Sequence, residues 1–333
     1  MKVEETILLV NEQYEINISS ATRIKNVYKL EGDKKDYCLK LVSYEYGHFL
    51  FILGVIKHLV NMGFNNTLKL IQTKSGKDYI KYEDKFAYVT EWIEARECNY
   101  DNPIDLIIAT STLANLHKKS EAFIVTKEMK PRIYWSKWIE NFETRRNEIL
   151  GFKNKAYKSS EFDYNYLRQC TTVAEKAQVA IENLKKTNYY EKMMIEKKKG
   201  GYCHHDYAHH NVLINKNNKA FIIDFDYCIL DTHLHDLASL LIRKMKHGRW
   251  DVEYSKDIME VYRTIYPLKQ DDIPIMAAFM EFPQDFWQLG IQYYWEEQPW
   301  EEQFFLNKLN KIIIDKAGKE EFLQDFKKLK VRW

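Results

Sequence analysis

Several features that would mark other classes of protein are scarce in this sequence of 333 residues. Its five cysteines are odd in number and widely scattered without a CxxC pair, which argues against a paired metal or redox motif and favours a reducing compartment. The longest apolar run, Phe49 to Ile56, is too short for a membrane span, and the acidic N-terminus predicts no signal peptide. The net charge of +2 does not indicate the positively charged surface that nucleic-acid binding requires. We therefore expect a small-molecule partner, with no nucleic acid and no membrane.

The chain length predicts two domains, each large enough to bury its own core. The first hundred residues alternate short apolar segments with turn-forming clusters, which predicts a small antiparallel sheet. The expected strands are QYEINI, IKNVYKL, YCLKLV, TLKLI, DYIKY and FAYVTEWI. Apolar residues at helical spacing predict one helix within this region, over residues 47–62.

From Pro103 onward the apolar spacing is mostly helical, with helices expected over 104–118, 134–150, 162–184 and 234–245 and further aromatic-rich helices after them. The exception is a pair of short apolar segments, NVLIN and AFIIDFD, joined by the polar turn KNNK. This pattern predicts a β-hairpin among helices. The second domain is therefore expected to be mainly α.

The loop YCHHDYAHHN, just before this hairpin, places His204, Asp206 and Asn211 in an HxDxxxxN pattern. Phosphoryl transfer needs an acid to orient the attacking hydroxyl and oxygen ligands to hold magnesium against the nucleotide phosphates. Asp206 suits the first role and Asn211 the second. Asp224 ends an apolar strand 18 residues after Asp206, so the hairpin can return it to the same site as the principal magnesium ligand. Turn caps and a strand end are the plainer reading of these residues, but their order and spacing favour the chemistry.

Nucleotide phosphates also need a cation, for which Lys40 on the predicted strand YCLKLV is the candidate. Taken alone, a lysine on an alternating strand is more often a solvated residue, so this assignment depends on the downstream motif. Kinase-like sites pair the strand lysine with a glutamate on the neighbouring helix, but no acidic residue occurs between Glu45 and Asp78. Glu45 or His48 could serve, or Lys40 could lack a partner.

A glycine-rich phosphate loop is missing as well, because no glycine occurs before Gly32. The predicted turn ISSATRIKN would have to replace it. Ser19, Ser20 and Thr22 could then supply hydroxyl donors, although a plain hairpin turn is the simpler interpretation.

Longer motifs resemble a known superfamily. HHDYAHHN with IIDFD, LANLH at 113–117 and DLASLL at 236–241 are similar to the aminoglycoside phosphotransferases and choline kinases. Over nearly the whole chain, VTEWIEARECNY, DFDYCILD, EFPQDFWQLGIQYYW and PWEEQFF resemble CotS-type spore coat proteins of endospore-forming bacteria. The resemblance implies an α+β, protein-kinase-like fold of two lobes: a small antiparallel sheet with one helix over 1–93, and a larger, mainly α lobe over 94–333.

The resemblance also implies roles for the catalytic loop, 204–211, and the metal loop, 224–226. Asp206 would be the catalytic base and His204 would orient the catalytic loop. Asn211 and Asp224 would bind magnesium and, through it, the nucleotide. Asp226 would either aid metal binding or only adjust the charge of the loop.

Four further residues receive roles by the same resemblance. Lys40 would contact the phosphates of ATP, Trp92 and Ile93 would offer backbone groups to adenine, and Asp236 would brace the catalytic loop. The implied function is an ATP- and magnesium-dependent phosphotransferase that acts on a hydroxyl of a small molecule or saccharide. Cytoplasmic synthesis followed by assembly into the spore coat, beside other coat proteins, is also implied.

Two other functions compete with this one. A non-catalytic coat component with a degenerate kinase fold is favoured by the missing glycine loop and the missing helix glutamate. A metal-dependent hydrolase would use the histidines, but their spacing lacks an HExxH or HxHxDH pattern. These histidines are His204, His205, His209, His210, His233 and His235.

Two features have plainer structural interpretations. The basic run 197–199, followed by two glycines, is interpreted as a solvated turn. A concentration of aromatic residues near the C-terminus is assigned first to packing and alternatively to the wall of an acceptor pocket. It consists of Trp287, Tyr293, Tyr294, Trp295 and Trp300.

Overall fold

The structure is a computed structural model that describes residues 2–155 and 159–330. The chain divides into two compact units, Met1–Ile133 with Gly200–Leu230 and Tyr134–Lys199 with Asp231–Trp333. We call them the sheet unit and the helical unit. The catalytic and metal loops expected from the sequence both belong to the sheet unit, together with the N-terminal sheet. The division into lobes at residue 93 is a different cut of the chain and stays a prediction.

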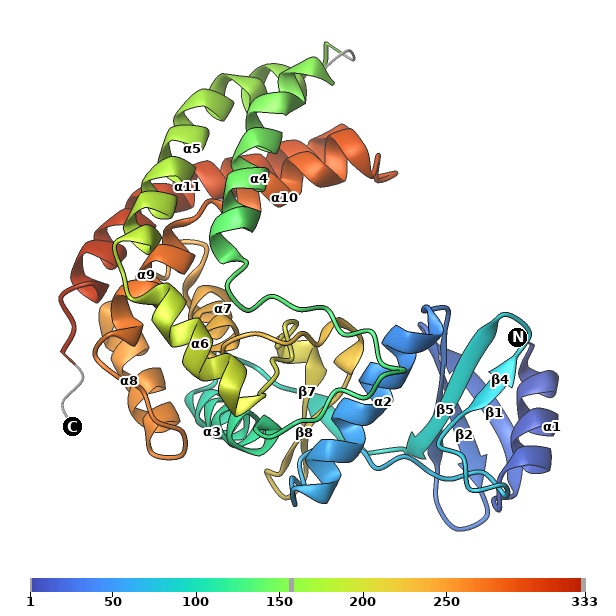
Figure 1. Ribbon diagram of the computed structural model, residues 1–333. Helices are drawn as coiled ribbons and strands as arrows, with labels where there is room; N and C mark the ends of the chain where they lie inside the picture. Colours follow the sequence, from blue (N-terminus) through green and yellow to red (C-terminus); the bar gives the residue numbers. More distant parts are fainter. Residues whose placement is uncertain (1, 156–158, 331–333) are drawn as a thin grey trace. The chain divides into compact units, whose positions relative to one another are not determined.

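A five-stranded antiparallel sheet, in the order β1-β2-β3-β5-β4, organises the N-terminal part of the sheet unit (Figure 1). Helix α1 (Val3–Gln13) precedes it and helix α2 (Tyr46–Asn61) follows β3. The strands are β1 (Ile18–Ile24), β2 (Val27–Gly32), β3 (Tyr37–Val42), β4 (Ile80–Tyr82) and β5 (Lys85–Glu91). The predicted antiparallel sheet and its helix are therefore confirmed.

The two helices cover opposite faces of this sheet because side chains alternate along each strand. Val10 of α1 packs in one buried cluster with Leu39 of β3, and Phe49 of α2 packs in another with Val42. Residues 40 and 42 have the same parity, so Lys40 is on the α2 face. This alternation determines on which side of the sheet the lysine can act.

A second antiparallel sheet has the order β6-β7-β8, with strands β6 (Ala95–Glu97), β7 (Val212–Asn215) and β8 (Ala220–Ile222). The predicted hairpin is confirmed as β7 and β8. The strand β6 was not predicted, because three residues are too few to show an alternating pattern. Helix α3 (Pro103–Ser120) follows, and Asn102 caps it by accepting the N–H groups of Ile104 and Asp105.

The N-terminal region differs from the prediction in three places. Residues 3–13 form α1, a helix that was not predicted, and QYEINI contributes only an isolated bridge at Tyr14 and the first residue of β1, Ile18, although a strand was expected there. ISSATRI forms strand β1 although a turn was expected there. The segment TLKLI contributes only isolated bridges, such as the one between Leu70 and Thr90. The strand β1 was not predicted because its Ser and Thr residues give it no apolar alternation. It is an edge strand, which needs few apolar side chains.

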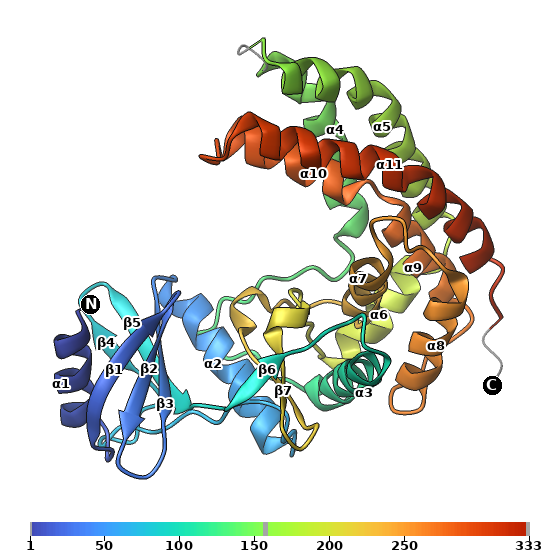
Figure 2. The same ribbon diagram turned by 180° about the vertical axis from the view of Figure 1, so that it is seen from behind.

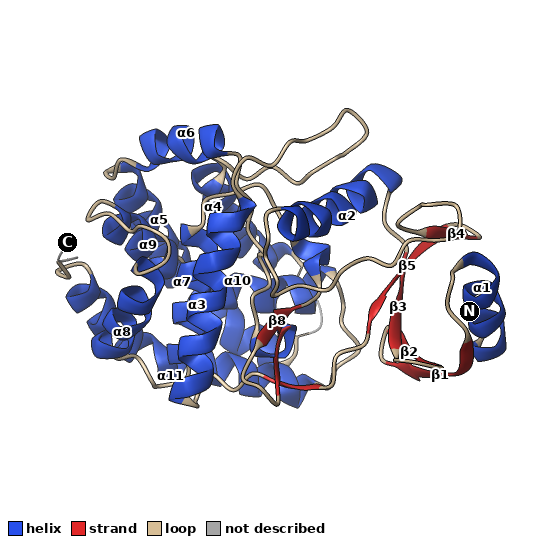
Figure 3. Cartoon of the chain, turned by 90° about the horizontal axis from the view of Figure 1, so that it is seen from below, coloured by secondary structure: helices blue, strands red, loops and turns tan. Residues whose placement is uncertain are grey.

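Helices build the helical unit, and strands are drawn only in the sheet unit (Figures 2 and 3). The helices are α4 (Trp138–Gly151), α5 (Glu161–Lys185), α6 (Tyr189–Lys199), α7 (Leu234–Met245), α8 (Val252–Arg263), α9 (Asp272–Glu281), α10 (Gln284–Gly290), a π-helix (Ile291–Trp295) and α11 (Glu302–Phe326). The predicted helices 134–150, 162–184 and 234–245 correspond to α4, α5 and α7. The basic run 197–199 ends helix α6, so the solvated turn predicted there was wrong.

Aromatic packing forms the core between α4, α5, α10 and α11. Tyr166 stacks on Phe286 with ring centroids 4.1 Å apart and donates its hydroxyl to the Phe286 carbonyl. Tyr293 and Tyr294 of the π-helix are buried in the same cluster, whereas Trp295 and Trp300 are exposed. The predicted packing role therefore holds for the two tyrosines. Within the described residues, no helix is long and apolar enough to cross a membrane.

Candidate phosphotransfer site

The catalytic loop is held by a hydrogen-bonded link between Asp206 and Asn211. The Nδ2 of Asn211 donates to the Asp206 backbone oxygen at 2.9 Å and to its carboxylate Oδ2 at 3.0 Å. A further turn bond joins the Asn211 N–H to the Ala208 carbonyl at 2.9 Å. Because Nδ2 is the donor, the role of metal ligand falls to Oδ1 of the same amide. The five-residue spacing seen in the sequence is therefore the spacing of a direct contact.

The hairpin returns the chain to this loop. The N–H of Ile223, just after β8, donates to the Asn211 carbonyl at 3.0 Å, so Asp224 comes one residue beyond that contact. Asp224 has φ 64° and ψ 66°, the left-handed conformation that Asp tolerates better than most residues. This turn leads the chain from β8 into the 3₁₀ helix η3 (Phe225–Tyr227).

His204 connects the catalytic loop to the metal loop. Its side chain is fully buried, with the ring 5.0 Å from that of Phe225, centroid to centroid. Nε2 lies 2.9 Å from the Ile223 carbonyl, which can only accept, so Nε2 is the donor. The contact fixes the positions of the two loops relative to each other.

Lys40 reaches the metal loop from β3, where it is paired with Val27 of β2 and Tyr88 of β5. Its ammonium lies 2.7 Å from Oδ1 of Asp224 and 2.7 Å from Oδ1 of Asp226. Lys40 is only 7% exposed, so its own side chain is largely shielded from water. The sequence left its partner open, and the structure supplies two, both from the segment after β8.

These ion pairs change how the groups titrate. Burial by itself would raise the pKa of Asp224, but the Lys40 ammonium outweighs it and holds the pKa below its usual value. Burial would likewise lower the pKa of Lys40, yet Tyr88 and the carboxylates of Asp226 and Asp224 raise it above the usual value. Asp224 is therefore ionised and Lys40 protonated at neutral pH, as cation binding and phosphate binding require.

Asp226 is held from the helix side. The Tyr44 hydroxyl donates to its Oδ2 at 3.0 Å, and Nε2 of His48 lies 3.3 Å from its backbone oxygen. Burial, followed by the Asp226 carboxylate, raises the pKa of Tyr44 to about 12, so this hydroxyl remains a donor. The other candidate partner of Lys40, Glu45, pairs instead with Lys130 at 2.8 Å. Asp226 thus takes the place on Lys40 that a helix glutamate would occupy.

The hydroxyl groups considered for a phosphate loop lie along β1. Ser20 donates to the Glu31 carboxylate at 2.7 Å and Ser19 to the Glu31 backbone oxygen at 3.3 Å. Thr22 is also within this strand, paired with Lys29. The turn itself is only Lys25 and Asn26, and Lys25 has a positive φ of 54°. The preferred interpretation, a plain hairpin turn, therefore holds, and Ser19, Ser20 and Thr22 lie in the edge strand instead of a loop of hydroxyl donors.

Trp92 and Ile93 lie in the short segment between β5 and β6. The backbone N–H of Trp92 already donates to the Asp36 carbonyl at 2.9 Å, and its indole N–H donates to Glu94 at 3.0 Å. Ile93 is half-buried. Any adenine contact through a backbone N–H therefore falls to Ile93.

The histidines of the catalytic loop do not form a transition-metal site. His209 and His210 are exposed, whereas His204 is buried against the metal loop. Over residues 2–155 and 159–330, His204, His205, His209 and His210 belong to no group of three His, Cys, Asp or Glu side chains that could share an ion. The hard oxygen atoms of Asn211 and Asp224 suit magnesium instead.

Solved structures of known proteins share this fold. Over 96% of the chain, the structure matches that of an aminoglycoside phosphotransferase from Alicyclobacillus acidocaldarius, of which it covers 95%, with a TM-score of 0.82 and 19% identity. It matches spectinomycin phosphotransferase over 99% of both chains, with a TM-score of 0.69 and 17% identity. For a choline kinase from Cryptosporidium parvum the TM-score is 0.60, at 12% identity over 97% of this chain and 96% of that one. The chain therefore has the predicted kinase-like α+β fold.

A family model described as "Spore coat putative kinase YutH" matches residues 8–326, and the chain belongs to that family. A relative in Bacillus subtilis (strain 168), spore coat protein S, is 22% identical over 309 residues. The match covers 92% of this chain and 88% of the relative. The resemblance seen in the sequence is thus confirmed at the level of the family and of the fold.

Proposed function

We propose that this protein is an ATP- and magnesium-dependent phosphotransferase of the bacterial spore coat that acts on a hydroxyl of a small molecule or saccharide. The observation that carries the proposal is the connected set Lys40, Asp224, Asn211 and Asp206, all within the sheet unit. Lys40 contacts Asp224, the hairpin sets Asp224 beside Asn211, and Asn211 contacts Asp206. One unit thus supplies a cation for phosphates, oxygen ligands for magnesium and a carboxylate for the acceptor.

Each residue has a defined part in the proposed reaction. Asp206 accepts the proton of the acceptor hydroxyl while that oxygen bonds to the γ-phosphorus of ATP. The bond between this phosphorus and the β–γ bridging oxygen breaks, and ADP leaves. Magnesium, when bound by Asn211 and Asp224, would neutralise charge on the phosphates. Lys40 adds a second positive charge there.

The proposed acceptor class is supported by the solved structures with the same fold, whose named ligands and substrates are small hydroxyl compounds such as spectinomycin and choline. Location in the spore coat follows from the family. Other coat proteins are the expected macromolecular partners, and synthesis in the cytoplasm would precede assembly.

The test is calorimetric titration of the native chain and of Asp224→Ala with ATP, with and without magnesium. We expect magnesium-dependent binding to the native chain and a loss of at least tenfold in the variant. A panel of hydroxyl acceptors that includes spectinomycin and choline, with Asp206→Asn as the control, then tests turnover. A native chain that does not bind ATP in the presence of magnesium would contradict the proposal.

One observation favours a second candidate, a coat component that keeps the fold for binding or assembly alone. The β1–β2 turn has only Lys25 and Asn26 and no glycine, so few backbone N–H groups can approach a phosphate. Tight binding of ATP and magnesium without transfer to any acceptor in the panel would support this candidate.

A further inference from the structure

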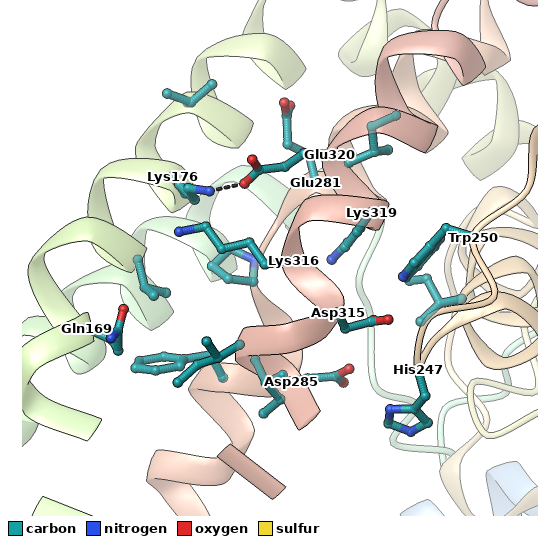
Figure 4. Close-up of a pocket in the computed structure, with 18 of the residues that line it drawn as sticks. Gln169, Lys176, His247, Trp250, Glu281, Asp285, Asp315, Lys316, Lys319 and Glu320 are labelled. Carbon is teal, nitrogen blue, oxygen red and sulfur yellow. Dashed lines mark hydrogen bonds and ion pairs between the residues drawn. The ribbon is translucent and has the colours of Figure 1, made fainter. Parts of the chain in front are cut away.

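A pocket of about 420 Å³ lies within the helical unit (Figure 4). It is lined by residues of α5, α7, the connection between α7 and α8, the end of α9, the start of α10, and α11 from Ile312 onward. Every lining residue belongs to the helical unit, and none is a residue of the candidate phosphotransfer site. The volume is within the range of roughly 300–1,000 Å³ that small-molecule sites occupy.

Apolar side chains from three helices form part of the wall. Val173 of α5, Phe286 of α10 and Leu323 of α11 line the pocket, and the last two are almost fully buried. Trp250 contributes an aromatic surface from the connection between α7 and α8. A ligand with an apolar body would therefore lose its water on entering and gain contact area.

Three lysines converge on the same pocket. Lys176 comes from α5, and Lys316 and Lys319 come from successive turns of α11 (Figure 4). Lys176 pairs with Glu320. In the part of the chain that the structure describes, neither Lys316 nor Lys319 has a carboxylate within ion-pair distance, and the ammonium of Lys319 lies 5.8 Å from the Trp250 ring centroid. The three lysines therefore carry more positive charge than the one ion pair, between Lys176 and Glu320, neutralises.

The titration of two lysines agrees with this crowding. Burial, and then the neighbouring Lys316 and Lys319, lower the pKa of Lys176 to about 8. Burial also lowers the pKa of Lys319, although Asp285, Asp315 and Glu281 act in the opposite direction. An anion placed among these ammonium groups would offset their mutual repulsion. It would also compensate the cost of burying their charges away from water.

Two acidic residues of the pocket form hydrogen bonds or ion pairs with groups other than these three lysines. Asp315 accepts the backbone N–H of Gly248 at 2.5 Å, and Glu281 accepts from Lys327 at 2.9 Å and from Asn183 at 2.7 Å. In Figure 4, Asp285 and Asp315 lie away from Lys176 and Lys316, whereas Lys319 lies nearer to Asp315 and Trp250. The part of the pocket beside Lys176 and Lys316 is therefore the part that most favours an anionic group.

We propose that this pocket is a second ligand site, which binds a small organic anion with its carboxylate, sulfonate or phosphate group among Lys176, Lys316 and Lys319 and its apolar body against Val173, Phe286 and Leu323. The site is independent of phosphoryl transfer, since it shares no residue with that site. Its ligand is defined by two features together, a single anionic group and an apolar body.

The probe for this site is 8-anilinonaphthalene-1-sulfonate, an aromatic anion whose fluorescence rises on entering an apolar site. Its uncharged counterpart, N-phenyl-1-naphthylamine, has the same rings without the sulfonate. Both are titrated into the folded full chain, with and without ATP and magnesium. We expect saturable binding of one sulfonate probe per chain, not displaced by ATP, and binding of the amine at least tenfold weaker.

Two variants and a control test whether the probe binds in this pocket. Lys316→Met with Lys319→Met keeps most of the side-chain length, removes two charges and should weaken sulfonate binding at least tenfold while leaving amine binding unchanged. Lys311→Met, at an exposed lysine of the same helix outside the pocket, is the matched control and should behave as the native chain. Val173→Phe, which narrows the pocket, should weaken both probes. Circular dichroism checks that each variant is folded.

Three results would overturn the proposal. The first is equal sulfonate affinity in the native chain and the double lysine variant, and the second is equal affinity of the native chain for the two probes. The third is displacement of the sulfonate by ATP and magnesium, which would assign the probe to the phosphotransfer site.

Discussion

The two carboxylates that contact Lys40 should have separable roles, and substitution of each by asparagine tests this. Both lie 2.7 Å from the ammonium, but the Asp226 side chain is 8% exposed and that of Asp224 is 32% exposed. At an effective dielectric constant of about 20, unit charges at this distance attract by about 6 kcal/mol before the cost of desolvation. Desolvation offsets much of this, and water screens the more exposed pair further.

The expected free energies of unfolding follow from this difference. Asp226→Asn should destabilise the chain by about 3 kcal/mol, because it breaks a buried ion pair and leaves Lys40 less compensated. Asp224→Asn should cost only about 1 kcal/mol. The order should reverse for ligand binding, since Asp224 is the proposed magnesium ligand. Asp224→Asn should weaken binding of ATP with magnesium at least tenfold, and Asp226→Asn by less than Asp224→Asn.

Stability is measured by urea unfolding in EDTA, which removes any contribution from metal, and is followed by circular dichroism. Hydrogen exchange of β3 reports local loosening around Lys40. The exposed Asp257→Asn of the helical unit is the matched control and should change neither quantity by more than about 0.5 kcal/mol. The reasoning is refuted if Asp226→Asn is as stable as the native chain, or if it abolishes magnesium-dependent binding as completely as Asp224→Asn does.

Three further changes should have measurable effects. Tyr44→Phe removes the donor to Asp226 and should cost about 1–2 kcal/mol in urea unfolding; no loss would mean that this hydrogen bond does not position the metal loop. Gly290→Ala places a methyl group against Tyr166 and Phe152 and should lower stability by about 1–3 kcal/mol, and an unchanged midpoint would show that this core can expand. Burial raises the pKa of Asp231 to about 6, so the unfolded chain releases this proton at lower pH than the folded chain does. Its contribution should therefore reduce stability by about 2 kcal/mol as pH rises from 4 to 7, and Asp231→Asn should flatten that part of the pH profile.

Features that depend on short-range patterns could be predicted from the amino-acid sequence. The helical spacing of apolar residues predicted α2, α5 and α7, and the apolar segments around KNNK predicted the hairpin of β7 and β8. The HxDxxxxN spacing also reflects a local contact, since Asn211 bonds to Asp206 within one turn of the loop. Such contacts are encoded by neighbouring residues, so they can be read without the fold.

Contacts between residues far apart in the chain could be seen only in the folded protein. Lys40 is 184 residues from Asp224, and no local pattern indicates that Asp226 would replace the missing helix glutamate. The polar strand β1 and the helix α1 were also missed, because their conformation depends on neighbours in the sheet and not on their own periodicity. The pocket lined by Lys176, Lys316 and Lys319 could not be predicted from the sequence for the same reason. Its residues on α5 and α11 are more than a hundred positions apart, and only the packing of these helices brings their charges together.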